Sequence, residues 1–205
     1  VEEARQVAEA GALAALRHLG VELTQPPSYL SEHERVLYEK LRVHALLNRM
    51  PEEPEKEAFS PLVEEVAYEH WHRMLFARFL AENGLLMYPD PNHPVPVTLE
   101  ECGELAPEYK ARDGWELASR FAQGMLPQVF RKDSPLFELV LPPEHQSRLT
   151  RLVEGLPPDV FGASDSIGWV YQSWQGKRKD EVNRSEAKIG ARELPAVTQL
   201  FTEPY

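Results

Sequence analysis

Apolar residues recur every three to four positions along most of the chain, which is the spacing that places them on one face of an α-helix. Strict alternation of apolar and polar residues, the pattern of a half-buried strand, is not sustained anywhere. The pattern therefore predicts an all-α fold of several helices, with at most one small strand pair. The expected helices cover residues 1–19, 31–50, 60–83, a short stretch from 98, 113–130, 143–153, 165–179 and a last short one within 193–200.

Several of these helices begin with recognisable start signals. Ser31 with Glu34, and Thr98 with Glu101, have the spacing of a capping box, and Asp113 with Glu116 is a similar start. Ser60-Pro61 reads as an N-cap followed by proline at the first helical position. Prolines predict loops over 21–30 and 85–97, whereas 134–141 is compatible with either a helical turn or a strand.

The helix expected over 60–83 carries the broadest apolar stripe and is the candidate for the centre of the core. Trp71 lies on that stripe, and we expect it to be buried. His70 and His72 flank it, but two residues apart on a helix they point about 200° away from each other and cannot share a metal ion. We expect both histidines to be partly exposed and hydrogen-bonded, and we expect no metal site.

The composition, with 42% hydrophobic and 27% charged residues, is that of a soluble globular protein. There is no uninterrupted apolar stretch of bilayer length, and the acidic start VEEARQVAEA does not resemble a signal peptide. Cys102 is the single cysteine, so an internal disulfide is excluded, and its acidic neighbours would raise its thiol pKa rather than activate it. These features agree with a cytoplasmic protein. No motif for a catalytic residue is present.

The net charge of −11 argues against strong nucleic-acid binding by the chain as a whole, because phosphate neutralisation requires a basic surface. The positive charge is nevertheless concentrated near the C-terminal end. A solvated helix face is the simpler interpretation of this basic run, and contact with DNA phosphates is the alternative. The basic run comprises Lys177, Arg178, Lys179, Arg184, Lys188 and Arg192.

The last forty residues contain the most specific pattern. An aromatic segment, GWVYQSW, is followed by the basic stretch KRKDEVN and then by KIGARELPAVTQLFTEPY. Ile167 to Tyr205 resembles the large adenine-specific DNA methyltransferases of type IIG restriction–modification systems and of BREX phage-defence systems, the PglX-like proteins. EVAYEHWHRMLFARFLAENGLL, VPVTLEECGELA, MLPQVF and LFELVLPPEH resemble the same family, so that the likeness spans most of residues 60–205.

The resemblance implies roles for particular residues. Phe201, Thr202, Pro204 and Tyr205 match the family's motif X, which packs beside the S-adenosylmethionine pocket, although Glu203 stands where many relatives have proline. The glycine-containing motif I and the [ND]PPY motif, which binds the extruded adenine, are absent and would lie beyond Tyr205.

The resemblance thus implies a helical N-terminal domain over 1–160 and a connector over 161–205 that enters a missing Rossmann-like methyltransferase domain. The whole protein would transfer a methyl group from S-adenosylmethionine to N6 of adenine in duplex DNA. This part of it would serve as a scaffold for the DNA cleft or as a docking element for other defence subunits. A helical protein-interaction module with no cofactor role is the alternative, which the acidic balance favours for 1–160.

Overall fold

The computed structural model describes residues 1–48, 58–90, 93–127, 130 and 134–162, together with the single residues 168, 170, 173, 174, 176 and 184. Among these residues it contains helices and turns but no extended strand, so the expected all-α fold is confirmed. The elements are α1 (Glu2–Leu19), α2 (Glu32–Leu47), α3 (Phe59–Glu82), α4 (Leu99–Leu105), α5 (Gly114–Met125) and α6 (Pro143–Glu154), with the 3₁₀ turns η2 (Pro135–Phe137) and η3 (Pro158–Gly162).

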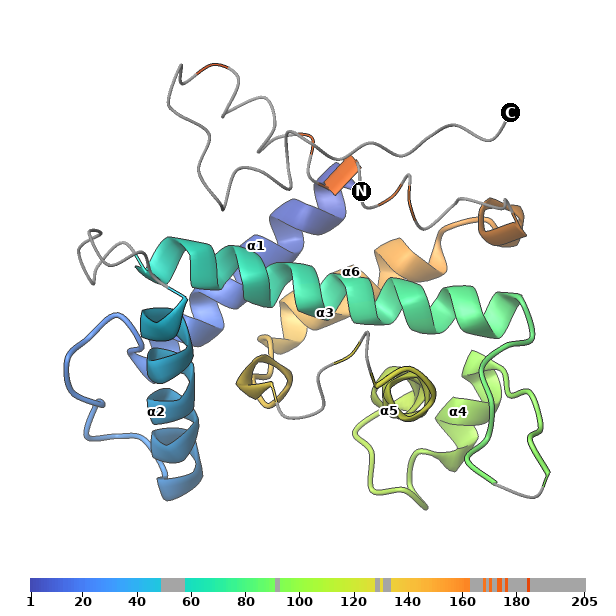
Figure 1. Ribbon diagram of the computed structural model, residues 1–205, viewed down its shortest axis with the longest axis horizontal. Helices are drawn as coiled ribbons and strands as arrows, with labels where there is room; N and C mark the ends of the chain where they lie inside the picture. Colours follow the sequence, from blue (N-terminus) through green and yellow to red (C-terminus); the bar gives the residue numbers. More distant parts are fainter. Residues whose placement is uncertain are drawn as a thin grey trace.

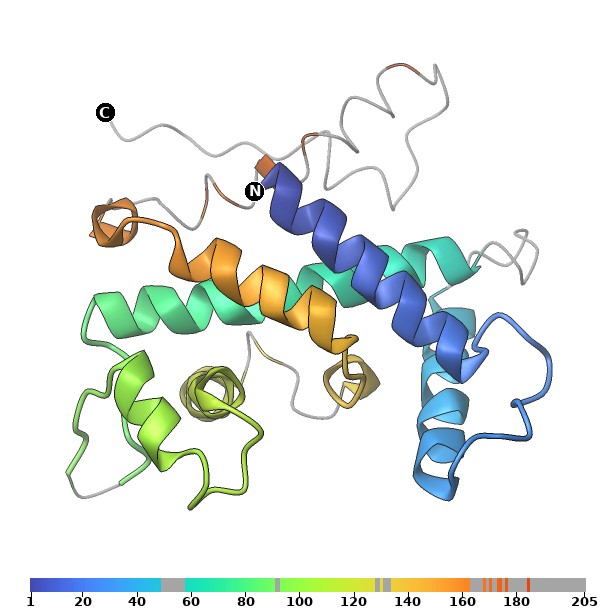
Figure 2. The ribbon, with the colours of Figure 1, turned by 180° about the vertical axis from the view of Figure 1, so that it is seen from behind.

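Helix α3 runs through the middle of the molecule and contacts most of the other elements (Figure 1). Helices α1 and α6 contact each other and lie on the same side of α3, as the view from behind shows (Figure 2). Helix α2 stands at one end of the structure, and α4 and α5 pack together at the opposite end. The long central helix therefore joins two groups of shorter helices.

The start signals read from the sequence are largely confirmed. In both capping boxes the hydroxyl oxygen of the first residue accepts from the backbone amide three positions on, at 3.3 Å for Ser31 and 3.1 Å for Thr98. The Glu34 and Glu101 carboxylates accept in return from the backbone amides of these two residues, at 2.8 and 2.7 Å. Asp113 caps α5 through a 2.8 Å bond from the Glu116 amide. These side chains satisfy amides that a helix start otherwise leaves unpaired.

Two helix boundaries differ from the sequence prediction. Helix α3 begins at Phe59 with Ala58 as its N-cap, so the prediction of Ser60 as the N-cap was wrong. Ala58 is buried, and packing of Ala58 and Phe59 against the core extends the helix past the local signal. Helix α5 ends at Met125, five residues before the predicted end at Phe130. Within residues 134–141 the structure has the 3₁₀ turn η2 at Pro135–Phe137 and no strand.

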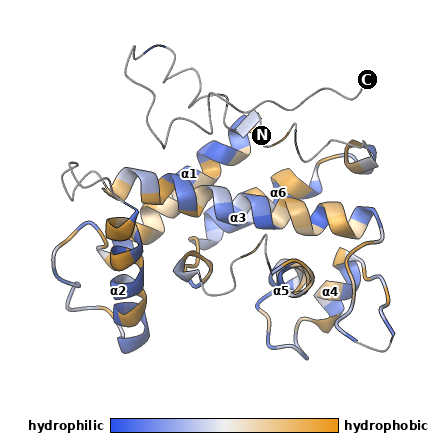
Figure 3. Cartoon of the chain, in the orientation of Figure 1, coloured by the Kyte–Doolittle hydropathy of each residue, from blue (hydrophilic) through white to orange (hydrophobic). Residues whose placement is uncertain are grey.

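The core consists of two hydrophobic clusters that share α3. The first half of α3 contributes to the larger cluster with α1, α2, α6 and η2, and Trp71 within it is 2% exposed, as expected. The C-terminal part of α3 contributes Ala77 and Leu80 to the smaller cluster with α4 and α5. Phe79 packs against both. Coloured by hydropathy, the helices carry both apolar and polar faces (Figure 3).

At two positions the structure shows why the residue is glycine, in one case conformational and in the other steric. Gly20 ends α1 with φ of 68°, the left-handed conformation that glycine adopts without strain, as its position after the last apolar residue predicted. Gly11 lies where α1 packs against α6: a Cβ atom added there would approach Cβ of His145 to 2.8 Å. A side chain at Gly11 would therefore push the two helices apart.

Among the described residues, sheet-like pairing occurs in the connection between α3 and α4. Met87 and Pro96 form a single antiparallel bridge, flanked by a 2.9 Å bond from the Tyr88 amide to the Val95 carbonyl and a 2.7 Å bond from the Val97 amide to the Leu86 carbonyl. This agrees with the expectation of at most one small strand pair. None of the described helices combines the length and the apolar character of a membrane span.

Candidate functional site

The aromatic segment that precedes the basic run packs onto the centre of α3. The indole of Trp174 stacks on that of Trp71, with ring centroids 4.4 Å apart and planes inclined by 24°. The ring of Tyr68, one turn before Trp71 on α3, meets Trp174 edge-on at 5.7 Å. Trp174 is only 7% exposed, although it lies more than one hundred residues from its partners in the chain.

A second residue of the same segment, Val170, packs against the larger hydrophobic cluster. Gly168, Val170, Ser173, Trp174 and Gly176 are helical, in agreement with the helix predicted over 165–179. Trp174 of the GWVYQSW motif thus connects this segment to α3 through tertiary contacts. We call Tyr68, Trp71 and Trp174 the aromatic anchor, which fixes the chain just before the basic run.

The two histidines beside Trp71 lie in different surroundings from those expected. His70 is 4% exposed, so the prediction that it is partly exposed was wrong. Helix α3 is enclosed on several sides, and a position next to Trp71 also faces protein, here the segment around Leu136 and Leu139. Burial, reinforced by the positive charge of Arg73, lowers the pKa of His70 to about 3. His70 is therefore neutral at ordinary pH.

His72 is half-buried, as expected, and lies in an aromatic row. Its ring stacks on Tyr68 with centroids 5.1 Å apart and contacts Phe76 at 5.8 Å and Phe130 at 5.7 Å. Burial lowers the pKa of His72 to about 4. In neither histidine does the setting suit a general base near neutral pH, because neither accepts a proton there. In the part of the chain that the structure describes, no group of three or more His, Cys, Asp or Glu side chains could hold a metal ion.

Arg78 is a structural anchor that the sequence pattern did not reveal. Its Nη1 atom donates to the carbonyl oxygens of Val153 at 3.1 Å and Glu154 at 2.9 Å, and its Nη2 atom donates to that of Leu156 at 3.1 Å. These carbonyls lie at and just beyond the C-terminal end of α6, where a helix carries a partial negative charge. The guanidinium also pairs with Glu82 at 3.1 Å. Arg78 thus ties α3 to the end of α6.

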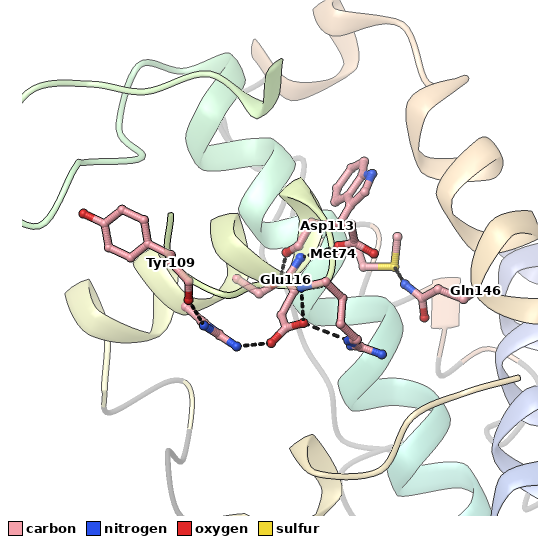
Figure 4. A network of polar contacts seen from close by, with 9 residues as sticks. Met74, Tyr109, Asp113, Glu116 and Gln146 are labelled. Atoms are coloured by element: carbon pink, nitrogen blue, oxygen red, sulfur yellow. Dashed lines mark hydrogen bonds and ion pairs between the residues drawn. The ribbon is translucent and has the colours of Figure 1, made fainter. Parts of the chain in front are cut away.

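A polar network covers the junction of α5 with the other helices (Figure 4). The Glu116 carboxylate accepts from Nε of Arg112 at 2.8 Å and pairs on its other side with Arg120. Burial would raise the pKa of Glu116, but the bonds from Arg112 and Arg120 outweigh it and lower the pKa to about 2. The indole of Trp115 donates to Glu154 at 3.2 Å. These contacts hold the start of α5 in place and link α5 to α6, so we interpret the network as stabilising the fold.

Arg73 is half-buried and Cys102 is buried, and neither has the setting of a reactive group. Burial, together with the charge of Arg112, lowers the pKa of Arg73 to about 10, and its guanidinium lies 4.7 Å from the centre of the Phe137 ring. Cys102 is fully buried, and burial with the charge of Glu101 raises its thiol pKa to about 11. This confirms the expectation of an unreactive thiol, since the nucleophile is the thiolate.

Most residues predicted from the sequence to contact cofactor or DNA lie outside the described residues. This holds for Phe201, Thr202, Pro204 and Tyr205 of the predicted cofactor motif. In the basic run it holds for Lys177, Arg178, Lys179, Lys188 and Arg192, whereas Arg184 is described as helical and exposed. The proposed roles of these residues remain predictions. What the structure adds is the aromatic anchor immediately before them.

Comparison with known proteins gives two relatives. The adenine-specific methyltransferase PglX of Lacticaseibacillus casei (strain Zhang) is 27% identical over an alignment of 183 residues that covers 71% of this chain. The adenine-specific methyltransferase BrxX of Escherichia coli O9:H4 (strain HS) is 27% identical over 183 residues that cover 75% of this chain. The aligned part is 15% of each relative's length.

The other comparisons give no match: no family model and no solved structure is similar to the chain. The chain spans a small part of the two proteins that it resembles. The resemblance expected from the sequence motifs is confirmed by both: this chain is related to the PglX-like adenine-specific methyltransferases.

Proposed function

We propose that this chain is the N-terminal helical part of a longer S-adenosylmethionine-dependent DNA methyltransferase that modifies N6 of adenine in a restriction–modification or phage-defence system. The observation that carries the proposal is the similarity to PglX and BrxX over about three quarters of the chain. The chain itself acts as a scaffold that shapes the DNA cleft or docks other defence subunits. Catalysis belongs to the remainder of the protein.

The aromatic anchor supports a scaffold role. Because Trp174 is stacked on Trp71, the segment leading towards the proposed cofactor motif starts from a fixed point on α3. The helical domain would thereby orient a catalytic domain that follows it. A DNA cleft formed between two domains requires such a fixed orientation. In this proposal Phe201, Thr202, Pro204 and Tyr205 pack beside S-adenosylmethionine.

The DNA partner is proposed to be duplex DNA in the cytoplasm, with the target adenine flipped out of the stack so that its amino group can be reached. In this proposal Lys177, Arg178, Lys179, Arg184 and Lys188 contact phosphates along the duplex. Phosphate contacts position a protein without reading sequence. They are compatible with the acidic charge of the rest of the chain, because only the local surface meets the DNA.

Transfer of tritiated methyl groups to DNA tests the assignment. The 205-residue chain alone should transfer none, whereas the longer polypeptide of which it is part should label adenine. In the longer protein, Thr202→Ala should weaken the binding of S-adenosylmethionine. Methylation by the 205-residue chain alone, or no adenine labelling by the longer protein, would contradict the proposal.

The basic run is tested separately in the longer protein. Changing Lys177, Arg178 and Lys179 to alanine should weaken binding to all DNA sequences alike and flatten the salt dependence by about one ion per lost contact. The methylated site should not change. The matched control changes Lys40, Lys110 and Arg148 to alanine, which removes the same charge elsewhere. If the two triple variants change DNA affinity and its salt dependence equally, the basic run does not contact phosphates.

One observation favours the second candidate, a helical protein-interaction module without a cofactor role. Val36, Val43 and Leu47 are 47%, 52% and 78% exposed along one face of α2, which stands at the end of the molecule (Figure 1). Exposed aliphatic side chains aligned on a helix are a common docking surface. Loss of a subunit from the assembled defence complex on Val43→Glu, with adenine methylation intact, would favour this role.

A further inference from the structure

Arg73 of α3 has no hydrogen-bond acceptor in the part of the chain that the structure describes. Its Nε atom is shielded from solvent and donates to no group there, and no ion pair holds its terminal amino groups. The guanidinium lies over the ring of Phe137, 4.7 Å from the ring centre. The ring fixes the guanidinium in place but provides no oxygen for its five N–H donors. A shielded donor without an acceptor costs free energy, so a ligand that supplies an acceptor is favoured.

Arg112, the residue before the N-cap of α5, is a second arginine with unused donors. Its Nε atom donates to the Glu116 carboxylate over 2.8 Å, whereas its terminal amino groups make no hydrogen bond with any described residue. The Arg112 side chain is 49% exposed, so these amino groups can meet a ligand from solvent. Glu116 also pairs with Arg120 and is thereby held itself. A guanidinium fixed in this way loses less conformational freedom when a ligand binds it.

The fold brings these two arginines close enough for their like charges to act on each other. Helix α3 packs against α5, and Arg112 directly precedes α5. Burial, and after it the charge of Arg112, lowers the pKa of Arg73 to about 10. Arg73 is still charged at neutral pH. Two like charges held near each other repel, and an anion bound between them would offset this repulsion.

The carboxylates around Arg73 have other partners. The charges of Glu116, Glu69 and Asp113 act on Arg73, but none of the described ion pairs joins one of them to it. Glu116 pairs with two other arginines, and Asp113 accepts from the backbone amide of Glu116 over 2.8 Å. Glu69 also has a partner. These carboxylates keep the surroundings of Arg73 polar without serving as its acceptors.

We propose that Arg73 and Arg112 form a binding site for a phosphate group, with the N–H donors of both guanidiniums donating to its oxygens. Arginine binds phosphate through paired, charge-assisted hydrogen bonds, and a tetrahedral phosphate has enough oxygens to accept from two arginines at once. The phosphate belongs to a DNA backbone or to a free phosphate compound. The site goes beyond the proposed methyltransferase function and does not depend on it, because its test measures binding and not methylation.

Two variants of the 205-residue chain provide a matched test. Arg112→Gln removes a surface guanidinium that pairs with Glu116, and the control Arg148→Gln removes one that pairs with Glu3 at 2.9 Å. Both variants lose one positive charge and one ion pair. Circular dichroism should show the helical signal of the unmodified chain in both. A third variant, Arg73→Lys, keeps the charge on α3 but removes the Nε–H group and so identifies its signal.

The measurement is the ¹H–¹⁵N signal of the Arg73 Nε–H group during a titration with inorganic phosphate at constant ionic strength. We expect a saturable shift in the unmodified chain and in Arg148→Gln. In Arg112→Gln the affinity should fall about tenfold or more, since charged hydrogen bonds are lost. Acetate at the same concentrations should leave the signal in place, and an acetate shift as large as that with phosphate would overturn the proposal. Equal phosphate affinities of Arg112→Gln and Arg148→Gln would overturn it as well.

A second titration, with a short DNA duplex, distinguishes the two sources of the phosphate group. A shift of the Arg73 signal with the duplex, weakened in Arg112→Gln and retained in Arg148→Gln, identifies the DNA backbone as the ligand. A shift with inorganic phosphate but not with the duplex identifies a free phosphate compound. If neither inorganic phosphate nor the duplex shifts the Arg73 signal, the proposal is wrong.

Discussion

The Nη1 atom of Arg78 donates to the backbone carbonyl oxygen of Glu154 over 2.9 Å, joining the middle helix to the end of α6. The side chain of Arg78 is 9% exposed, so these bonds are formed largely out of water. A largely buried guanidinium that donates to the carbonyls at the end of a helix stabilises the fold, because without it these carbonyls would lose a charged donor.

Arg78→Met should therefore lower the free energy of unfolding by about 2–4 kcal/mol, since it removes several charged hydrogen bonds from carbonyls that are largely shielded from water. Urea titration measures the change. The matched control is Arg148→Met, which removes a surface pair with Glu3 at 2.9 Å, both side chains being more than half exposed. That change should cost less than about 1 kcal/mol. Equal costs would show that the Arg78 contacts contribute little.

Trp71→Ala should destabilise the chain by about 3–5 kcal/mol, the usual cost of replacing a large buried aromatic side chain by alanine. It removes the ring on which Trp174 stacks, so the emission of Trp174 should also shift to longer wavelength as water reaches the indole. A denaturant titration followed by fluorescence measures both. Leu47→Ala, at a position 78% exposed, is the control and should change stability by less than about 0.5 kcal/mol. A cost for Trp71→Ala below about 1 kcal/mol would contradict the stacked geometry.

Gly11→Ala should destabilise the chain by about 1–3 kcal/mol, because the added methyl group meets Cβ of His145 and forces α1 away from α6. The control is Gly124→Ala in α5, where an added Cβ meets nothing within 4 Å. There the higher helix propensity of alanine should stabilise the chain by up to about 1 kcal/mol. The thermal unfolding midpoints of the two variants should thus shift in opposite directions, and shifts of the same sign would contradict the close approach of α1 and α6 at Gly11.

The stability of the fold should fall as the solution is acidified below pH 6.5. Burial lowers the pKa of His72 to about 4, from an ordinary value near 6.5. Between these values the unfolded chain binds a proton that the folded chain does not, so stability is present above pH 6.5 and is lost as pH falls through about 4. His70, with a pKa of about 3, acts in the same direction.

His72→Phe keeps an aromatic ring between Tyr68 and Phe76 but removes this titration. The free energy of unfolding should therefore decline less steeply between pH 6.5 and 4 in the variant than in the unmodified chain. Urea titrations at several pH values measure the slope, and His33→Phe, at an exposed position, provides the control. Parallel slopes in the unmodified chain and His72→Phe would contradict the burial of His72.

The sequence by itself determined the fold class and most helix starts. A capping box is local: Ser31 and Glu34, or Thr98 and Glu101, need only four adjacent residues to make their bonds, and the same holds for Gly20 at the end of α1. The apolar stripe around Trp71 likewise identified the buried face. The resemblance to the methyltransferase family could be recognised from the sequence because it depends on contiguous motifs. The two relatives confirm it.

Only the tertiary structure decided the contacts between distant elements. The start of α3 at Phe59, the burial of His70 and the pairing of Arg78 with the end of α6 each depend on neighbours far away in the chain. The stacking of Trp174 on Trp71 is of the same kind. Periodicity reports how a residue lies on its own helix, whereas packing and long-range hydrogen bonds depend on which helices meet it, and that is fixed only when the whole chain folds.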